Sequence, residues 1–289
     1  MDIKRAHFSA VTYGDVMNAM KRLGRPNKNL ADAVQARQEI DLRLGASFTR
    51  FQSINFKSLL GVEKDKPVSY GPCQFPTLGF VVERYQKIRD FKPQKFWVLD
   101  LRYEEGKFNV KFNWRRNKIF DKVICFVIYQ KSIEAKEAEV TKYNTRKIDK
   151  KRPHPLNTIQ MQKLVTSKLK MSSAQAMKVA EALYNRGYIS YPRTETTKYN
   201  KTFNLRDLVK KHENSNDWGD FAQRIVNGDL YGGPRNGNSD DKAHPPIHPV
   251  KSGYKSEMKP EEWAVYNLIT RHFLAAVSKN AEGLLTTLE

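Results

Sequence analysis

The chain has 289 residues, and its 51 lysines and arginines exceed its 31 aspartates and glutamates to give a net charge of +20. A basic excess of this size favours a polyanionic partner, most often a nucleic acid. The 2 cysteines are too few and too far apart for a zinc site, and they are typical of a reducing compartment. No apolar run approaches the roughly 20 residues that cross a bilayer as a helix. We therefore expect a cytosolic or nuclear protein with no membrane partner.

The N-terminal part of the chain predicts helices. Residues 13–23 are typical of a short helix, and a longer one is expected from Leu30, with Asn29 as its cap. Arg37 and Asp41 lie on or beside its apolar stripe, and a charged pair there is either a structural ion pair or part of a site. The spacing alone favours the structural interpretation. The stripe recurs at three- and four-residue steps and consists of Leu30, Ala33, Ile40, Leu44, Phe48 and Phe51.

The middle of the chain changes from helix to strand. A loop from residue 69 leads into a helix with Pro76 in its first turn. Within residues 96–142 the stretches FWVLDLRY, KFNVKFNW and KVICFVIY are rich in β-branched and aromatic residues, so we expect a sheet. The charged run that follows predicts an exposed strand and a linker.

Residues 156–191 predict two helices joined by a tight turn. Ser172 and Gln175 have the spacing of a capping box, and Gly187 suits the end of the second helix. The stretch YISY then predicts a strand. This order resembles a helix-turn-helix with a wing, a module that commonly binds DNA through its second helix. Many helix pairs bind nothing, so the pattern alone leaves the function open.

The C-terminal part begins with loops at residues 200–257. His244 and His248 are four residues apart, a spacing that suggests a metal site on a helix. The prolines between and after them forbid that helix, so we expect no metal there. Residues 259–279 predict another helix, and the final stretch EGLLTTLE predicts a strand.

The stretch GYISYPRTET, residues 187–196, contains the candidate catalytic group. A free tyrosine has a pKa near ~10 and is a poor nucleophile unless a cation stabilises its phenolate. In an extended segment Tyr191 and Arg193 share one face, so both can meet the same phosphate. Thr194 and Glu195 add a hydroxyl and a carboxylate that can position the strand or the arginine. The alternative is that Tyr191 is the aromatic residue of a wing strand, and spacing alone favours this alternative.

Several separated blocks resemble a known family in its own order along the chain. These blocks are QARQEIDLRLGASFTRFQ, YGPCQFPTLGFVVER, FNWRRNKIF, GYISYPRTET and PRNGNSDDKAHPPIHP. Together they are similar to the type IA DNA topoisomerases, and specifically to the eukaryotic topoisomerase III branch. The resemblance covers almost the whole chain.

The resemblance implies catalytic roles for three residues. Tyr191 would be the nucleophile that forms a 5′-phosphotyrosine link to one DNA strand. Arg193 would hold the scissile phosphate, and His244 would lie near the phosphate or the tyrosine. By the same resemblance, Mg²⁺ would be the cofactor.

The resemblance also implies residues that bind the DNA strand. Arg37 and Asp41 would line a single-strand groove on the long helix, and Gln74 would contact the strand. Thr194 and Glu195 would complete this DNA-binding set.

The implied fold is α+β and multi-domain, the core of a toroidal enzyme with a winged-helix-like domain and a β-rich arch. The first 30 residues lack the D-x-D-x-E cluster with which the family's Toprim domain holds Mg²⁺. We therefore expect no metal ligands in this chain and a truncated piece that is inactive alone. The expected divisions are 1–26 as a Toprim remnant, 27–88 as a helical single-strand-binding base, 89–148 with 258–289 as an incomplete arch, and 149–257 as the tyrosine domain.

The implied function is transient cleavage of one DNA strand, strand passage and resealing without ATP, which relaxes negative supercoils and separates linked DNA. The expected partners are single-stranded DNA, a RecQ-type helicase and an OB-fold accessory protein, with RNA also allowed, and the expected location is the nucleus. One alternative is a non-catalytic winged-helix protein that binds single-stranded DNA. Another is a tyrosine nuclease of the rolling-circle type. That class has two metal-binding histidines on either side of one apolar residue, whereas three residues separate His244 from His248.

Overall fold

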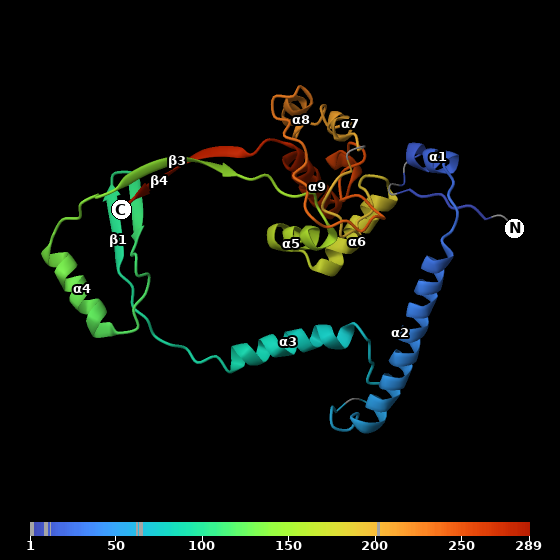
Figure 1. Ribbon diagram of the computed structural model, residues 1–289, viewed down its shortest axis with the longest axis horizontal. Coiled ribbons are helices and arrows are strands. Elements are labelled where there is room, and N and C mark those ends of the chain that lie inside the picture. Colours follow the sequence, from blue (N-terminus) through green and yellow to red (C-terminus); the bar gives the residue numbers. More distant parts are fainter. Residues whose placement is uncertain (1–2, 9–10, 12, 62, 64–65, 201–202) are drawn as a thin grey trace. The chain divides into compact units, whose positions relative to one another are not determined.

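The computed structural model describes residues 3–8, 11, 13–61, 63, 66–200 and 203–289 (Figure 1). The internal contacts divide the chain into two units, one formed by Met1–Pro26 with Lys142–Glu289 and the other by Asn27–Thr141. Each unit is described by itself. The predicted divisions of the chain remain expectations, and the one at 1–26 falls partly outside the described residues.

The core of the first unit is built from three helices, α5 (Thr158–Leu169), α6 (Ser173–Asn185) and α9 (Pro260–Val277), which pack on one another. The predicted helix pair and the helix near residue 260 are confirmed. The largest fully buried side chains of the unit include Met161, Leu183, Ile189, Tyr266 and Phe273. Burial of this apolar surface is the main stabilising contribution to the unit.

Local sequence signals set the ends of α5 and α6. Asn157 accepts a hydrogen bond from the Gln160 amide, and Ser172 accepts one from the Gln175 amide. Gly187 follows α6 with φ of 72°, the left-handed conformation that glycine adopts at little cost. The prediction of a strand at YISY is wrong in detail, because Ile189 and Pro249 form only an isolated bridge. Pro245, Pro246 and Pro249 have no N–H with which to extend a ladder.

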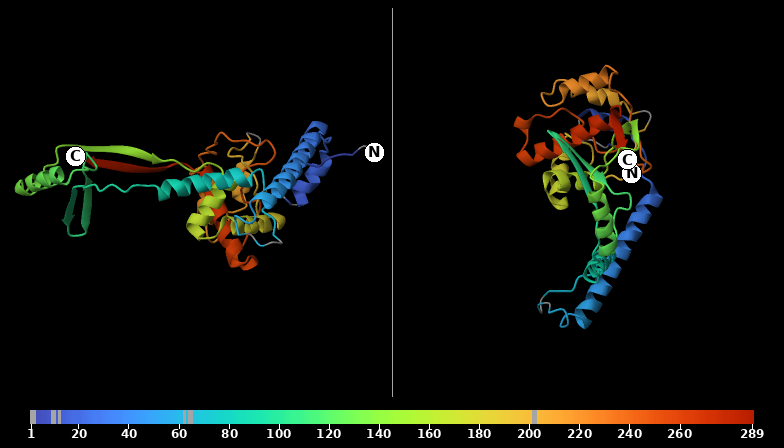
Figure 2. Two further views of the ribbon diagram at one scale, coloured as in Figure 1. Left: turned by 90° about the horizontal axis from the view of Figure 1, so that it is seen from below. Right: turned by 90° about the vertical axis from the view of Figure 1, so that its left-hand side faces the viewer.

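The rest of the first unit consists of shorter elements. The predicted N-terminal helix is α1 (Tyr13–Lys21). The region predicted as loops contains α7 (Leu205–Lys210), α8 (Gly219–Val226) and a 3₁₀ turn, Lys255–Glu257. Both predicted strands are present, and β3 (Tyr143–Lys150) pairs antiparallel with β4 (Ala281–Leu288). Figure 2 shows the two strands side by side along their length, and almost all of their residues are exposed.

The second unit contains the two long helices of the N-terminal part, α2 (Lys28–Asn55) and α3 (Gln74–Arg89). Both are where the sequence predicts them. The cap of α2 is Asn27 and not Asn29, because Asn27 is extended and its side chain accepts the Leu30 amide. The apolar stripe of α2 is not a buried core face in this unit, where neither helix has a buried residue.

A hairpin and a helix complete the second unit. Strands β1 (Asp100–Glu105) and β2 (Phe108–Asn113) pair antiparallel around a turn with Gly106 at φ of 57°. The predicted strand at KVICFVIY is wrong, because these residues begin α4 (Lys122–Glu134). Asp121 accepts the Val123 and Ile124 amides and so begins a helix in a stretch whose composition favours a strand. Among the described residues no helix is both long and apolar enough to span a membrane.

Candidate active site around Tyr191

The backbone next to Tyr191 is joined to the loop that carries both histidines. Ser190 donates its amide to the His248 carbonyl at 3.0 Å and its hydroxyl to the Pro246 carbonyl at 3.0 Å. The His248 amide returns a hydrogen bond to the Ser190 hydroxyl at 3.0 Å. Ser190 and His248 are buried, so these bonds are shielded from water and hold the two segments firmly together.

Tyr191 itself is partly buried between two rings. Its ring centroid lies 4.6 Å from that of His244 and 5.2 Å from that of Tyr184 on α6. In the described part of the chain its hydroxyl has no hydrogen-bond partner. Burial and the neighbouring Tyr191 phenol raise the pKa of Tyr184. The ring contacts therefore orient Tyr191, and its hydroxyl oxygen forms no hydrogen bond within the described chain.

Asp241 links the tyrosine segment to the histidine loop. One carboxylate oxygen accepts the Thr194 hydroxyl at 2.8 Å, and the other accepts the amides of Ala243 and His244 at 2.9 Å each. Burial acts to raise the pKa of Asp241, but the hydrogen bonds from these amides and from Thr194 outweigh burial and lower it. The ionised carboxylate thus fixes the backbone that carries His244.

Arg193 points to an acidic residue on α6. Its Nε donates to Glu181 Oε1 at 2.7 Å, and a second guanidinium nitrogen lies 2.6 Å from the same oxygen. The side chain of Arg193 is 60% exposed, so a phosphate can reach it and compete with Glu181. Thr194 is buried with its hydroxyl bound to Asp241, whereas Glu195 is exposed and its amide donates to Asp241 at 3.3 Å.

The other predicted DNA-binding residues belong to the second unit. Arg37 Nε lies 3.7 Å from Asp41 Oδ2, and both side chains are at least half exposed, so the pair is not part of a core. Asp41 also lines a shallow groove with Arg50 and Tyr70. Gln74 is the first residue of α3 and lines a small pocket of its own. A groove with a cation, a carboxylate and an aromatic face suits a nucleic-acid strand.

The carboxylates near Tyr191 do not fit a Mg²⁺ site. Asp241 is saturated by amide and hydroxyl donors, and Glu181 is paired with Arg193. Among the described residues no group of three or more acidic, histidine or cysteine side chains is placed to hold a metal ion. Magnesium prefers carboxylate oxygens that are free to coordinate it, so these residues provide no cation site.

Comparison with known proteins identifies the family. A family model described as "DNA topoisomerase" matches residues 25–289. The chain belongs to the DNA topoisomerase family. Within it, the chain is 43% identical to DNA topoisomerase 3 of Caenorhabditis elegans over 288 residues, which are 98% of this chain and 38% of that protein. It is 42% identical to human DNA topoisomerase 3-alpha over 292 residues, which are 100% of this chain and 29% of that protein. The chain thus spans about a third of the length of these topoisomerases.

The fold is that of a topoisomerase of known structure. The full-length topoisomerase I from Thermotoga maritima matches with a TM-score of 0.74 and 22% sequence identity. The match covers 98% of this chain and 45% of that chain. This mixed α/β fold and the family membership confirm the resemblance found in the sequence.

The sequence analysis did not predict two residues of this candidate site, Asp241 and Glu181. Asp241 accepts the amides of Ala243 and His244, which are two and three residues after it. This is the spacing of an Asx turn, a signal that the sequence contains. Glu181 stands one helical turn before Tyr184, but nothing in the sequence indicates that it meets Arg193. That contact forms because the chain turns at Gly187, so that Arg193 lies beside Glu181 on α6.

Proposed function

We propose that this chain carries the strand-cleaving tyrosine of a topoisomerase III-like enzyme, with Tyr191 as the nucleophile. The observation that supports the proposal is the Tyr191 hydroxyl, which has no hydrogen-bond partner among the described residues and lies beside a fixed His244 and an accessible Arg193. A tyrosine that only packed in a wing would need no such neighbours. The family membership and the topoisomerase 3 relatives agree with this reaction class.

The reaction would be a transesterification at one phosphodiester of a single DNA strand. The Tyr191 oxygen attacks phosphorus and loses its proton, while the bond to the 3′ oxygen breaks and that oxygen gains a proton. The strand then carries a 5′-phosphotyrosine link and a free 3′ hydroxyl. Resealing reverses each step. Because one phosphoester replaces another, no ATP is needed, and strand passage occurs while the gap is open.

Arg193 and His244 would act on the phosphate. Arg193 would leave Glu181 and donate to the non-bridging oxygens, where charge gathers as the bond to tyrosine forms. His244 lies against the tyrosine ring, so its imidazole can contact the same phosphate or the departing oxygen. Asp241 would act through His244 by fixing its backbone. Mg²⁺ remains the expected cofactor of the whole enzyme, but no step is assigned to it because the carboxylates beside Tyr191 do not fit the ion.

The remaining residues would bind the strand. Arg37, Asp41 and Gln74 would bind single-stranded DNA in the second unit, where Asp41 lines a groove with Tyr70. The ring centroid of Tyr70 lies 4.7 Å from that of Phe75. Exposed rings and cations bind single strands with little sequence preference. Glu195 would lie at the edge of the cleavage site. Thr194 would hold the backbone of the site in place through its hydrogen bond to Asp241.

The proposal includes an architecture for the whole enzyme. The helix pair α5 and α6 would be a winged-helix-like domain with Tyr191 after its second helix, and β1 to β4 would belong to a β-rich arch in a toroidal molecule. The divisions near residues 26, 88, 148 and 257 are retained as part of this proposal. Single-stranded DNA is the expected substrate, with RNA also allowed, and the expected setting is the nucleus beside a RecQ-type helicase and an OB-fold protein.

Covalent capture tests the proposal directly. The chain is incubated with end-labelled single-stranded DNA and Mg²⁺, quenched with detergent, and compared with Tyr191→Phe. We expect a protein–DNA band that the variant lacks. The variant keeps the ring contacts and loses no hydrogen bond, so its melting temperature should be unchanged. An equal band from both proteins would contradict the role of Tyr191. Normal DNA binding with no band would leave the chain as a non-catalytic DNA-binding unit.

A further inference from the structure

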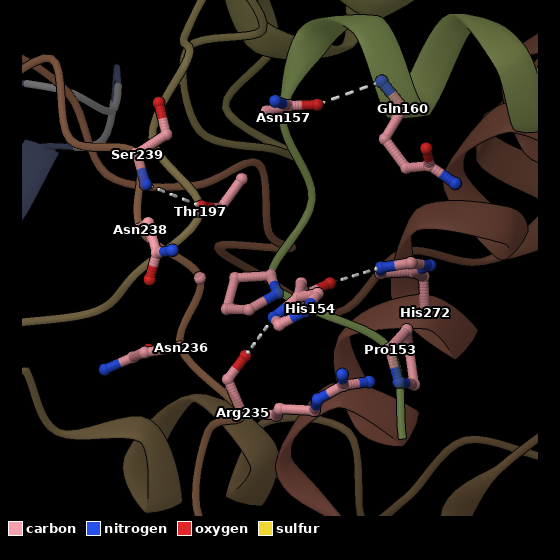
Figure 3. A pocket seen from close by; sticks show the side chains of 12 residues that line it. Pro153, His154, Asn157, Gln160, Thr197, Arg235, Asn236, Asn238, Ser239 and His272 are labelled. Atoms are coloured by element: carbon pink, nitrogen blue, oxygen red, sulfur yellow. Dashed lines mark hydrogen bonds between the residues drawn. The ribbon is translucent and has the colours of Figure 1, made fainter. Parts of the chain in front are cut away.

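A pocket in the first unit lies outside the tyrosine site and has several polar residues in its lining. It has a volume of about 620 Å³ and is formed by the start of α5, the segment 235–239, Thr197 and His272 of α9 (Figure 3). Pockets that hold small ligands commonly span about 300–1,000 Å³. The lining includes an arginine and two histidines but no aspartate or glutamate. Its chemistry therefore favours a neutral or anionic ligand.

Side-chain amides of the pocket are available to a ligand. Within the described residues, the amides of Gln160 and Asn238 have no hydrogen-bond partner, and Asn157 uses only its oxygen, to cap α5. Figure 3 shows that they come from different elements, Asn157 and Gln160 from the start of α5 and Asn238 from the facing segment. Each amide offers two donors and an acceptor, the groups that read the edge of a nucleobase.

The other walls of the pocket are held in place. His154 Nδ1 donates to the Arg235 carbonyl at 2.9 Å, and His272 Nε2 donates to the His154 carbonyl at 2.8 Å (Figure 3). Arg235 donates one N–H to the Arg152 carbonyl at 2.9 Å, which leaves other N–H groups of its guanidinium for a ligand. Burial lowers the pKa of His272 and so favours its neutral ring. These bonds preform the pocket, which reduces the ordering cost of binding.

The pocket shares two segments with the tyrosine site. The Thr197 amide donates to the Ser239 carbonyl at 2.9 Å, and the Ser239 amide donates to the Thr197 hydroxyl at 3.3 Å. Further along the same two segments, Thr194 donates to Asp241. The pocket and the tyrosine site therefore lie along one continuous pair of segments.

We propose that this pocket binds one nucleotide of a single DNA strand, with its base held by Gln160 and Asn238 and its phosphate by Arg235. The inference rests on the proposed function, since it takes the strand cleaved at Tyr191 as the ligand. The flat faces of His154 and Pro155 suit a base, and the arginine suits the phosphate. Such a site would hold the strand beside the break while the gap is open.

The test uses the full chain with a thymidine octanucleotide that carries one 5-iodouracil, crosslinked by light and mapped by mass spectrometry. We expect crosslinked peptides from residues 153–160 or 235–239, and a loss of these crosslinks when dTMP is added as competitor. Gln160→Ala and Asn238→Ala should each weaken dTMP binding, measured by calorimetry, about five-fold, as for one lost hydrogen bond. Neither variant should lower the melting temperature, because neither amide is bonded within the described chain.

The matched control is Gln130→Ala, which removes an exposed helical glutamine of α4 and should leave dTMP binding unchanged. Three results would overturn the pocket proposal: no crosslinks in these peptides, unchanged dTMP affinity in both variants, or inorganic phosphate competing as well as dTMP. The Tyr191 adduct is measured in the same samples. If the adduct forms and the pocket assay fails, the proposed function stands without this site, whereas pocket binding without an adduct would count against Tyr191 alone.

Discussion

The Thr194 hydroxyl donates a hydrogen bond to Asp241 at 2.8 Å, which joins the segment after Tyr191 to the loop that carries His244. The same carboxylate accepts the amides of Ala243 and His244, so one side chain sets the position of both segments. A carboxylate that accepts several hydrogen bonds stabilises its surroundings through each of them. This relationship makes Asp241 the first residue to change.

Asp241→Ala should release His244 from its position over Tyr191. We expect adduct formation to fall at least ten-fold, and the free energy of unfolding to fall by about 1–3 kcal/mol, because the donors lose their acceptor. Detergent-quenched capture and urea unfolding measure the two effects. Asp240→Ala is the control, since Asp240 binds Lys198 and the Lys242 amide but accepts no hydrogen bond from Thr194 or from the His244 amide in the described chain. Equal losses in both variants would show that Asp241 has no special role.

Glu181→Gln should increase adduct formation at low DNA concentration. The side chain of Glu181 holds Arg193 in the free protein and competes with the phosphate. An exposed ion pair contributes about 0–1 kcal/mol, so the expected gain is at most about five-fold. Asp229→Asn removes a comparably exposed pair with Arg224 and should change nothing. A fall in adduct for Glu181→Gln would mean instead that Glu181 holds Arg193 in its working position.

The stability of the first unit should fall as the pH drops from about 6.5 to about 4. Burial lowers the pKa of His212 and of His248 to about 4, whereas both titrate near ~6.5 when unfolded. Between these values the unfolded chain binds more protons, so protonation favours unfolding, by up to roughly 3 kcal/mol for each histidine. Asp241, with its lowered pKa, stabilises the fold above about pH 4 and loses this effect only in stronger acid. Urea unfolding at pH 7.5 and 4.5 measures the change.

His212→Phe should reduce this pH dependence without destabilising the protein at pH 7.5. Both ring nitrogens of His212 are buried without partners in the described chain, and the ring packs against Trp218. An apolar ring removes the unpaired nitrogens and keeps the packing. His7→Phe, at an exposed histidine, is the control and should leave the pH profile as it is. An unchanged profile in His212→Phe would show that another group titrates.

Arg37→Ala should weaken binding of single-stranded DNA several-fold and reduce its salt dependence by about one phosphate contact. Its effect on the melting temperature should be small, because the pair with Asp41 is exposed. Lys28→Ala is a matched control on the same helix, since Lys28 forms a similarly exposed pair with Asp32. Fluorescence anisotropy at several salt concentrations compares the two. Equal losses of DNA affinity in Arg37→Ala and Lys28→Ala would indicate general electrostatic attraction to the helix and no specific groove at Arg37.

The sequence by itself determined the family, the basic character and most helices, because caps and apolar periodicity act over a few residues. Ser172 and Gly187 mark helix ends that the structure confirms. The sequence prediction was wrong at α4, where the Asp121 cap begins a helix in a stretch with a β-rich composition. It was also wrong at YISY, where prolines in the partner segment prevented a strand. Only the tertiary structure brought Asp241 to Thr194 and Glu181 to Arg193. Thr194 and Asp241 are far apart in the chain, and Glu181 and Arg193 lie on either side of the turn at Gly187. The geometry of both contacts depends on packing that no local pattern encodes.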